Sequence, residues 1–566
     1  MPKGRPFAPI NKPKKIKKFA VVDCETWGLG GPIAFGCIYI NEKRKFFFKT
    51  KIDFYEIVKR EQIKLMYAHN MEFDSIKIRG CSSFEQLKRD TQPLYAGGLL
   101  LSLTDDQGLE WRDSFTLLRS SVSALGQNLG LKKLETPDKF INPPKIKTIS
   151  ESDIKYCYRD CKIVYLFLIK LFELTGFQKL TIASTALAFF QSEYLDKTYF
   201  KHHLHEEFSK SYYGGRTEAF TFGAVNGTVY DINSQYPFAM RDIVLPDFTR
   251  LYKKSIISIK TFKQYLLKFE GMARVKVEQP KRRVAILPLR HNERLTFPTG
   301  IFTGEYNFNE LRFAILHGVK ILEVEFIIYS PFKIVNFFTD YVNDQYKLKV
   351  NSENAEKLIY KFLLNSLYGK FGQRKFDNVE YLDDEEFSKK CVELIKSKIT
   401  FKANSLGSGK NYLCYESSTI EETPHSIFTI ASYITSAARI QLTSKLLLYE
   451  SEVIYCDTDS ITLNTSKMNT GKQLGEWDEE DYQVTKVYGN KFYRTTKGLK
   501  LKGVPKRATI YGKKFEYPRF IKSKESMRTG KKVGTTEKFQ KSVSFNYTKR
   551  ERIKNDSVPI HLNGIN

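Results

Sequence analysis

The chain has 566 residues, too many for a single hydrophobic core, so we expect roughly three or four structural units. It carries 91 Lys and Arg against 63 Asp and Glu, a formal net charge of +28, which favours a polyanionic partner such as nucleic acid. No apolar stretch approaches the roughly 20 residues that span a bilayer, and the eight cysteines show neither CxxC pairs nor zinc spacing. The sequence therefore indicates neither a membrane-spanning protein, nor a disulfide framework, nor a zinc site of clustered Cys and His residues.

Residues 1–18 contain Lys, Arg and Pro but no acid, which favours a flexible basic arm over an amphipathic import helix. The free cysteines indicate a reducing compartment. We expect a soluble intracellular protein, in a host cytoplasm or in a mitochondrion, and organelle import stays open.

The first expected strand brings two carboxylates together. Phe19 to Val22 is an apolar run that leads into Asp23 and Glu25, which the period of two places on one strand face. Two acids on one face repel each other unless a cation lies between them. A lone Asp-x-Glu is expected by chance about once in a chain of this size, so by itself it is a weak signal.

Two further acids follow in chain order. The apolar run 65–68 ends in the segment 69–74, which closes on Asp74. A helix is expected from Ser150, whose hydroxyl can cap it, and Tyr156 and Asp160 then lie on one helix face. Taken singly, each of these acids is more often an ordinary surface residue.

Together the three segments read Asp-x-Glu, Asn-x-x-Phe-Asp and Tyr-x-x-x-Asp, and they resemble the three exonuclease motifs of proofreading DNA polymerases. Hydrolysis of a phosphodiester by two divalent ions roughly 3.5–4 Å apart needs several carboxylates. By that resemblance the metal-binding and catalytic residues are Asp23, Glu25, Asp74 and Asp160, with Tyr156 orienting the attacking water. The resemblance implies DNA contacts from His69, Asn70, Phe73, Ser121 and Lys133.

A second set of acids lies far downstream. The strand from Val229 delivers Asp231 and leads into Tyr236, and 453–461 predicts a hairpin with Asp457 and Asp459 at its tip. The patterns Asp-x-x-Ser-x-Tyr-Pro and Tyr-x-Asp-Thr-Asp-Ser resemble the polymerase motifs of family B DNA polymerases. The resemblance implies two Mg²⁺ ions, with Mn²⁺ as an alternative, held by Asp231, Ile232 and Asp459 and supported by Asp457.

Between these motifs, Asn351 and Ser352 break one expected helix and start another. A basic stripe is usually a solvated face, but this one ends in Lys-x-x-x-Asn-Ser-x-Tyr-Gly and resembles the nucleotide-binding fingers helix of family B. By that resemblance the nucleotide contacts are Lys349, Lys357, Lys361, Asn365 and Tyr368, together with Tyr236. Tyr236 is expected to exclude a 2′ hydroxyl, which makes the product DNA.

Three shorter elements match the same family. Tyr212 with Gly214 and Gly215 resembles the linker between the exonuclease and polymerase domains, where glycine admits a closely passing template strand. Lys491 and Tyr493 match the element that contacts the primer terminus, and 500–506 resembles the start of the thumb.

The fold class implied is multidomain, with an RNase H-like α/β 3′–5′ exonuclease followed by an α+β right-hand polymerase of palm, fingers and thumb. The expected order is a basic arm (1–18), exonuclease (19–205), linker and first palm segment (206–250), palm with a first insertion (251–330), fingers (331–374), a second insertion (375–420), palm (421–498) and a thumb with a basic tail (499–566).

The compact length and the motif wording most resemble the protein-primed subgroup of phages, adenoviruses and linear plasmids. That resemblance implies a DNA polymerase with proofreading that starts from a terminal protein and replicates a linear genome by strand displacement. Its expected partners are template and primer DNA, dNTPs and a terminal protein, with the enzyme itself a monomer.

A DNA-primed or self-priming family B polymerase stays open as an alternative. A degenerate DNA-binding protein would have lost acids, and a nuclease alone would not need Asp231, Lys361 or Asp459.

Overall fold

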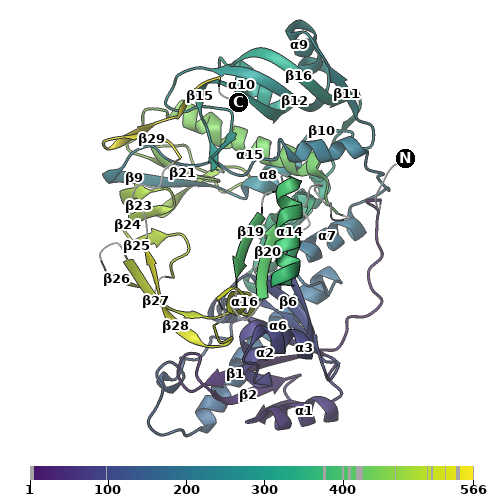
Figure 1. Ribbon diagram of the computed structural model, residues 1–566, viewed down its shortest axis with the longest axis vertical. Coiled ribbons are helices and arrows are strands. Elements are labelled where there is room, and N and C mark those ends of the chain that lie inside the picture. The colour runs from purple at the N-terminus through teal and green to yellow at the C-terminus, as the bar shows by residue number, and fades with distance from the viewer. Residues whose placement is uncertain are drawn as a thin grey trace.

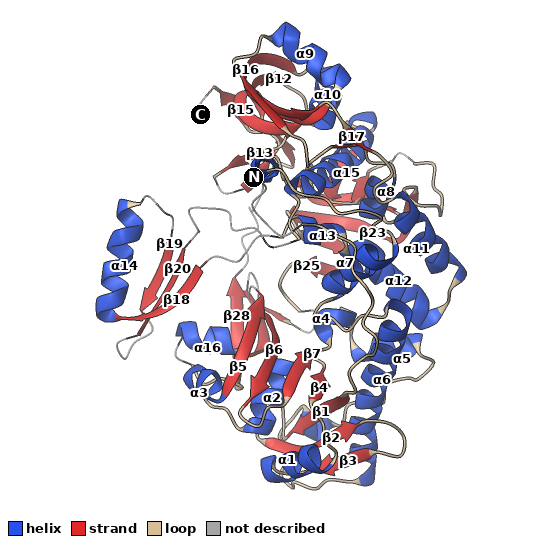
Figure 2. Ribbon diagram, turned by 90° about the vertical axis from the view of Figure 1, so that its right-hand side faces the viewer, coloured by secondary structure: helices blue, strands red, loops and turns tan. Residues whose placement is uncertain are grey.

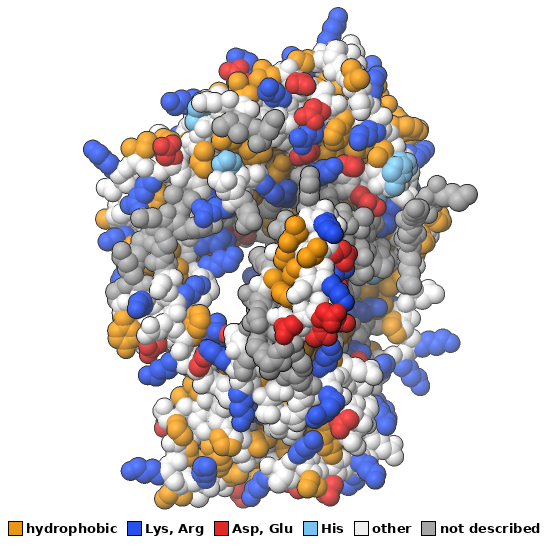
Figure 3. All heavy atoms as spheres, in the orientation of Figure 1, with side chains coloured by type: hydrophobic (Ala, Val, Ile, Leu, Met, Phe, Trp, Pro, Cys, Tyr) orange, Lys and Arg blue, Asp and Glu red, His pale blue; other side chains and the backbone are white. Residues whose placement is uncertain are grey.

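The structure is a computed structural model that describes residues 6–96, 99–292, 294–373, 378–397, 399, 401–405, 410–415, 423, 425–465, 467–505, 508–511, 514–529, 531–542 and 549–564. The first sheet of the chain, within residues 20–113, lies at one end of the long axis, and a second large sheet lies toward the other end (Figure 1). In the space-filling view this face is hollowed beside the C-terminal strands, and Lys and Arg side chains lie at the border of the hollow (Figure 3). Within the described residues, no helix is both long and apolar enough to cross a membrane.

In the described N-terminal part, seven strands form a mixed sheet in the order β3-β2-β1-β4-β7-β6-β5. β1 pairs in parallel with β4, and β4 in parallel with β7. The strands are β1 (Ala20–Thr26), β2 (Ile33–Tyr39), β3 (Lys45–Phe48), β4 (Leu65–Ala68), β5 (Thr91–Ala96), β6 (Leu99–Asp105) and β7 (Glu110–Asp113).

Each face of this sheet has its own core, because successive strand residues point to opposite faces. Val21 and Tyr67 belong to one core, whereas the adjacent Val22 and Met66 belong to the other. The helices around the sheet are α1 (Lys51–Arg60), α2 (Met71–Arg79), α3 (Phe84–Asp90), α4 (Phe115–Leu118), α5 (Val122–Asn128), α6 (Glu151–Thr175) and α7 (Ile182–Glu193).

The long helix α6 begins where the sequence predicts. Ser150 and Asp153 form a reciprocal capping box, in which the Ser150 side chain accepts from the Asp153 amide and the Asp153 carboxylate accepts from the Ser150 amide. The helix packs across β1 and β2. This packing carries Tyr156 and Asp160 to the strand that holds Asp23 and Glu25.

The second large sheet has, among the described residues, seven strands in the order β25-β24-β23-β9-β22-β21-β8. Helix α15 (Phe428–Leu448) covers one face, where Leu442 and Leu446 share a core with Tyr230 and Ile232. The strands are β8 (Thr217–Ala219), β9 (Gly223–Ile232), β21 (Val453–Asp457), β22 (Ser460–Leu463), β23 (Trp477–Gly489), β24 (Phe492–Thr495) and β25 (Gly498–Leu501).

Residues 252–330 add a separate antiparallel layer with helices α9 (Ile259–Lys268) and α10 (Phe308–Leu316) (Figure 1). Its described order is β11-β16-β12-β15-β31, so its last strand comes from the C-terminus. These strands are β11 (Tyr252–Ser255), β12 (Glu270–Gln279), β15 (Thr299–Asn307), β16 (Lys320–Ser330) and β31 (His561–Asn563); short pairs join β10 (Leu245–Pro246) to β17 (Lys333–Ile334) and β13 (Leu289–His291) to β14 (Arg294–Thr296).

Helices dominate the next segment. The break expected at 351–352 separates α11 (Thr339–Asn351) from α12 (Asn354–Ser366), which pack against each other. Helix α8 (Gln235–Arg241), from earlier in the chain, packs against α11, and α13 (Tyr368–Phe371) follows α12. A small unit stands apart from both large sheets in Figure 2, and it comprises β18 (Asn378–Asp383), α14 (Asp384–Lys396), β19 (Phe401–Ser405) and β20 (Lys410–Tyr415).

The C-terminal strands extend toward the N-terminal domain (Figure 1). β26 (Thr509–Tyr511), β27 (Lys514–Phe520) and β28 (Thr536–Ser542) form a sheet, with α16 (Ser523–Thr529) between the last two. Val533 is buried in the same core as Val22. This C-terminal sheet and the N-terminal domain are therefore joined by an apolar contact.

Residues 549–564, which the sequence assigns to the thumb and its basic tail, form strands. They form β29 (Glu551–Ile553), β30 (Asp556–Val558) and β31, which returns to pair in parallel with β15. Arg550 is buried and pairs with Glu218, which also pairs with Arg216. A buried guanidinium needs such partners, and they join this segment to β8 of the second large sheet.

Candidate active sites

Four predicted carboxylates converge at the N-terminal domain. Asp23 and Glu25 come from β1, Asp74 from α2 and Asp160 from α6. The Cys24 amide donates to Asp74 Oδ1 at 3.0 Å, which holds α2 against β1. Asp160 Oδ1 is buried with no hydrogen-bond partner among the described residues. An unsatisfied buried carboxylate oxygen beside other acids fits a divalent cation, which prefers oxygen ligands.

The pKa shifts of these carboxylates also favour a bound cation. Burial, with the neighbouring acids, raises the pKa of Asp23 well above its usual value. Burial raises the pKa of Glu25 and of Asp74 to about 8. Carboxylates held this way ionise fully at neutral pH only when a positive charge compensates them.

Lys133 lies inside the cluster rather than at its rim. Its ammonium contacts the Asp160 carboxylate and donates to the Tyr156 hydroxyl at 3.0 Å. The Thr136 hydroxyl is also 3.0 Å from Tyr156 Oη. Tyr156 is thus held by two partners at the place where it could orient a water, and Thr136 is a contributor that the sequence motifs did not indicate.

The residues predicted to contact DNA at this site differ in their burial and in their hydrogen bonds within the protein. His69 lies with Nδ1 3.0 Å from Ser114 Oγ and Nε2 2.9 Å from the Ser120 carbonyl, and burial lowers its pKa to about 4. Asn70 has a left-handed backbone, with φ of 69°. The Ser121 hydroxyl accepts from the Ala124 amide as the N-cap of α5, so it has a helix-capping role, and its DNA role stays a prediction.

Phe73 takes part in a contact that the sequence did not predict. Its ring centroid lies 5.2 Å from that of Phe520 on β27. The Ser523 amide donates to Glu72 Oε1 at 2.7 Å. A cavity of about 230 Å³ beside the cluster is lined by residues of both regions, among them Glu25, Phe73, Thr136, Pro518, Phe520 and Thr536. The C-terminal sheet therefore closes one side of this site.

The second set of acids meets at the edge of the palm. Asp231 at the end of β9 lies directly opposite Ser460 on β22, and the Ile232 amide donates to the Asp459 carbonyl at 2.8 Å. Tyr230 and Ile232 face α15, so the alternation along β9 turns Asp231 toward the opposite, open face. Burial and the Asp459 charge raise the pKa of Asp231 to about 7, and burial raises that of Asp459. This pair also fits a divalent cation.

Asp457 differs from this pair because the protein supplies its partners. Its Oδ1 accepts from Thr217 Oγ1 and from Lys491 Nζ, both at 2.8 Å. The supporting role of Asp457 stays a prediction. Lys491 and Tyr493 line a cavity of about 490 Å³ with Asp457, Lys500 and Lys502.

Sequence motifs missed two further acids. Asp478 on β23 lies opposite Asp231 in the strand register, and Glu480 adds to the charge that raises the pKa of Asp231. Their period of two on β23, Asp478-x-Glu480, is the signal that could have found them.

Cationic side chains gather beside the palm acids. Lys349 Nζ donates to Ser234 Oγ at 3.1 Å, and burial together with Lys361 and Lys357 lowers the pKa of Lys349. The positive charge of Lys361 offsets part of the rise in the pKa of Asp231. Asn365 lies on the same helix, α12, as Lys357 and Lys361. The predicted cluster is therefore assembled at one place, suited to a polyphosphate.

Two tyrosines stack between the acids and α12. The rings of Tyr236 and Tyr368 have centroids 4.0 Å apart and an interplanar angle of 10°. Tyr212 packs against Gly372, where an added Cβ would lie 2.6 Å from the Tyr212 ring. Tyr212, Tyr236 and Tyr368, which were predicted from separate motifs, therefore lie together on one side of the site.

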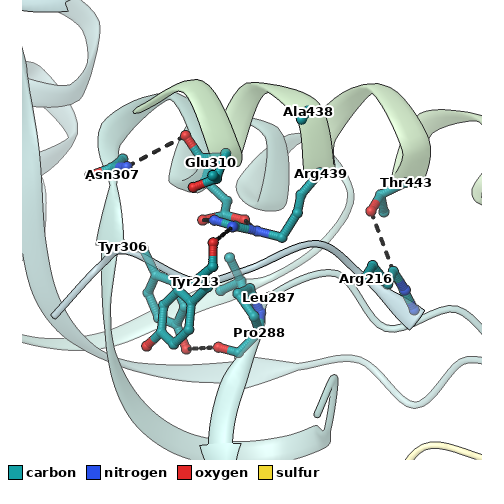
Figure 4. Close-up of polar contacts among 12 residues, drawn as sticks. Tyr213, Arg216, Leu287, Pro288, Tyr306, Asn307, Glu310, Ala438, Arg439 and Thr443 are labelled. Carbon is teal, nitrogen blue, oxygen red and sulfur yellow. Dashed lines mark hydrogen bonds and ion pairs between the residues drawn. The ribbon is translucent and has the colours of Figure 1, made fainter. Parts of the chain in front are cut away.

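The segment predicted as the linker, residues 212–215, is held by a buried ion pair between Arg439 and Glu310. Arg439 on α15 donates through Nε and Nη2 to Glu310 at 2.8 Å each, and through Nη1 to the Tyr213 carbonyl at 2.6 Å (Figure 4). Gly215 approaches the acidic hairpin so closely that a Cβ would lie 2.7 Å from Thr458 Cγ2. Arg439 was not predicted from the sequence; a charged residue in the apolar run of α15 was the available signal.

We expect Arg439→Met to destabilise the protein by roughly 3–5 kcal/mol, because it leaves the Glu310 carboxylate buried and unpaired. Urea unfolding followed by tryptophan fluorescence measures the change. Arg439→Met combined with Glu310→Met removes both charges and should recover part of the loss. A single variant no less stable than the double variant would show that the buried charge is not the cause.

The comparisons with known proteins agree with this arrangement. The family model of organellar and viral type B DNA polymerases matches residues 141–470. A probable DNA polymerase of Neurospora intermedia is 30% identical over 373 residues, 60% of this chain and 38% of that protein. The polymerase of Bacillus phage phi29 is 24% identical over 515 residues, 81% of each chain. The chain spans little more than a third of the fungal relative's length.

The fold comparison covers nearly the whole chain. A solved structure of phi29 DNA polymerase complexed with primer-template DNA superposes with a TM-score of 0.68 at 17% identity, over 93% of this chain and 100% of that one. The predicted fold class, an RNase H-like exonuclease domain followed by a right-hand polymerase, is confirmed, as is the resemblance to the protein-primed subgroup of family B.

Proposed function

Because the chain belongs to the organellar and viral type B DNA polymerases, we propose that it extends DNA primers on a DNA template and removes mismatched 3′ ends at a second site. The observation that carries the synthetic activity is the pairing of Asp231 with Asp459 beside the lysine cluster and the tyrosine stack. Template, primer and dNTPs are its proposed substrates.

Asp231 and Asp459, with the Ile232 carbonyl, would hold two Mg²⁺ or Mn²⁺ ions. Bound there, such ions lower the pKa of a primer 3′ hydroxyl and neutralise charge on a triphosphate. Lys349, Lys357 and Lys361 bind the triphosphate oxygens, and Tyr236 and Tyr368 support the base and sugar. Lys491, paired with Asp457, lies where a primer terminus would approach.

The exonuclease proposal is supported by the N-terminal carboxylates. Asp23, Glu25 and Asp160 would hold a divalent pair, with Asp74 holding α2 against β1. Ions bound there would supply positive charge to polarise a phosphodiester and to activate a water molecule. Tyr156 orients the water, while Asn70 and Phe73 bind the 3′-terminal nucleotide. We assign residues 19–205 to this domain, 206–498 to linker, palm, fingers and two insertions, and 499–542 to the thumb.

Tyr236→Val should admit ribonucleotides, lowering the preference for dNTPs over rNTPs by roughly 100-fold, because the ring that blocks a 2′ hydroxyl is removed. The measurement is the ratio of kcat/KM for dNTP and rNTP in primer extension. Tyr236→Phe keeps the ring stacked on Tyr368 and should keep the ratio. An unchanged ratio in the valine variant with normal dNTP use would rule out this role.

We further propose that synthesis starts on a hydroxyl of a separate terminal protein. A protein hydroxyl would replace the primer 3′ hydroxyl at Asp231 and Asp459, so one metal pair serves both reactions. The layer at 252–330 is the proposed contact for the terminal protein. The small unit at 378–415 is proposed to enclose the duplex and support strand displacement. The likeness to phage polymerases supports this reading.

The test incubates the enzyme with labelled dNTP, Mg²⁺ and the protein bound covalently to the ends of its genome, then looks for labelled protein on a denaturing gel. Asp459→Asn should abolish the label. Label on DNA-primed products alone would favour the alternative, a DNA-primed or self-priming polymerase, and leave the polymerase proposal intact.

A further inference from the structure

A thiol lies among the carboxylates of the N-terminal site. Cys157 follows Tyr156 on α6 and precedes Asp160 by three residues, so it lies on the face that Asp160 uses. Its Sγ is 3.4 Å from the Asp23 carbonyl oxygen and 3.8 Å from Asp23 Oδ2. The predicted motif Tyr-x-x-x-Asp places no requirement on this position.

The thiol also completes a cluster of ligand atoms. Within the described chain, one ligand atom each from Asp23, Glu25 and Cys157 lie within 4.8 Å of one another. Two ligands of a tetrahedral Zn²⁺ ion, with metal–sulfur near 2.3 Å and metal–oxygen near 2.0 Å, lie roughly 3.6 Å apart. A closing movement of about 1 Å is therefore enough to bring all three onto one ion.

A second observation points to the same ligand. Asp160 Oδ1 is buried and has no hydrogen-bond partner among the described residues, although its other oxygen pairs with Lys133. Asp160 is only 6% exposed, so solvent gives that oxygen little compensation. Asp160 lies outside the cluster of three ligand atoms, but an unsatisfied buried carboxylate oxygen on the same helix fits a cation bound nearby.

We propose that Cys157 is a metal ligand, and that Asp23, Glu25 and Cys157 form a mixed oxygen–sulfur site for Zn²⁺, Cd²⁺ or Co²⁺ within the proposed exonuclease centre. Mg²⁺ takes oxygen ligands in octahedral geometry, whereas a thiolate selects softer cations. When such an ion binds, the Cys157 S–H bond breaks, its proton goes to solvent, and a metal–sulfur bond replaces a metal–water bond.

The consequence is a difference between the two active sites. The palm pair Asp231 and Asp459 offers oxygen ligands, and the nearby Cys456 is buried on the α15 side of the sheet. A thiophilic ion held by Cys157 would keep Mg²⁺ out of the N-terminal site. Low concentrations of Zn²⁺ should therefore inhibit 3′–5′ degradation before they inhibit primer extension.

The experiment titrates the full-length protein with Cd²⁺ and follows the ultraviolet thiolate-to-cadmium charge-transfer absorption. Cys161→Val is the matched control, because Cys161 lies one turn further along α6, is equally buried, and has its Sγ 3.4 Å from the Cys37 carbonyl. Cys157→Val should lose one equivalent of this absorption, whereas Cys161→Val should keep it. Cys157→Ser, which keeps a polar group, should lose it too and serves if the valine variant does not fold.

A second readout is the Zn²⁺ concentration that halves degradation of single-stranded DNA in excess Mg²⁺. It should rise at least about tenfold in the Cys157 variants and stay unchanged in Cys161→Val. Equal Cd²⁺ absorption in Cys157 and Cys161 variants would overturn the inference. The inference rests on the proposed exonuclease function. A wild-type protein that binds Cd²⁺ through Cys157 but degrades no DNA would contradict only that proposed function.

Discussion

Asp459→Asn should lower primer extension at least about 10³-fold while single-strand degradation stays within about twofold of wild type. The reason is that the substitution removes the charge of one of the two carboxylates brought together at the end of β9 and in the turn before β22, where the Ile232 amide donates to the Asp459 carbonyl. A neutral oxygen binds a divalent cation far less strongly. Extension of a labelled primer and degradation of a labelled single strand measure the two activities in one preparation.

The matched control is Asp481→Asn, an exposed acid on β23 whose carboxylate contacts Lys497. It removes the same charge from the same sheet and should leave both activities unchanged. If Asp459→Asn retained extension, or if Asp481→Asn lost it, the assignment of the palm acids would be wrong.

Asp23→Ala with Glu25→Ala should have the opposite effect, a loss of 3′–5′ degradation of at least about 10³-fold with extension largely intact. Both side chains come from β1 and lie with the acids of α2 and α6, so removing them leaves too few oxygen ligands for a cation. Release of mononucleotides from a labelled single strand measures the loss.

Glu56→Ala is the control for this pair, because Glu56 is an exposed acid of the same domain on α1, away from the cluster. It should degrade DNA at the wild-type rate. A parallel loss of extension in the Asp23 and Glu25 variant, with the protein still folded, would contradict the separation of the two sites.

Local signals were sufficient for the elements that present the catalytic side chains. The capping box at Ser150, the alternation through Val21 and Val22 and the helix break at 351–352 all appear in the structure where the sequence predicts them. Each depends on residues within a few positions of one another, whose hydrogen bonds and periodicity are set by backbone geometry.

The resemblance of the motifs to a known family predicted that distant residues lie together, which periodicity alone cannot predict. Asp231 and Asp459 are far apart in the chain, and only the resemblance to a family placed them together before the structure did. The acids Asp478 and Glu480 on β23, which no quoted motif included, were missed for that reason.

The sequence by itself determined the charge, the acids that we propose bind metal, and the helices and strands that carry them, because these follow from residue type and short-range spacing. The tertiary structure alone decided that Phe520 contacts Phe73, that Arg439, paired with Glu310, binds the linker at the Tyr213 carbonyl, and that Arg550 returns to pair with Glu218. Such contacts join residues more than a hundred positions apart. They depend on which surfaces can be buried against each other, and no local pattern contains that information.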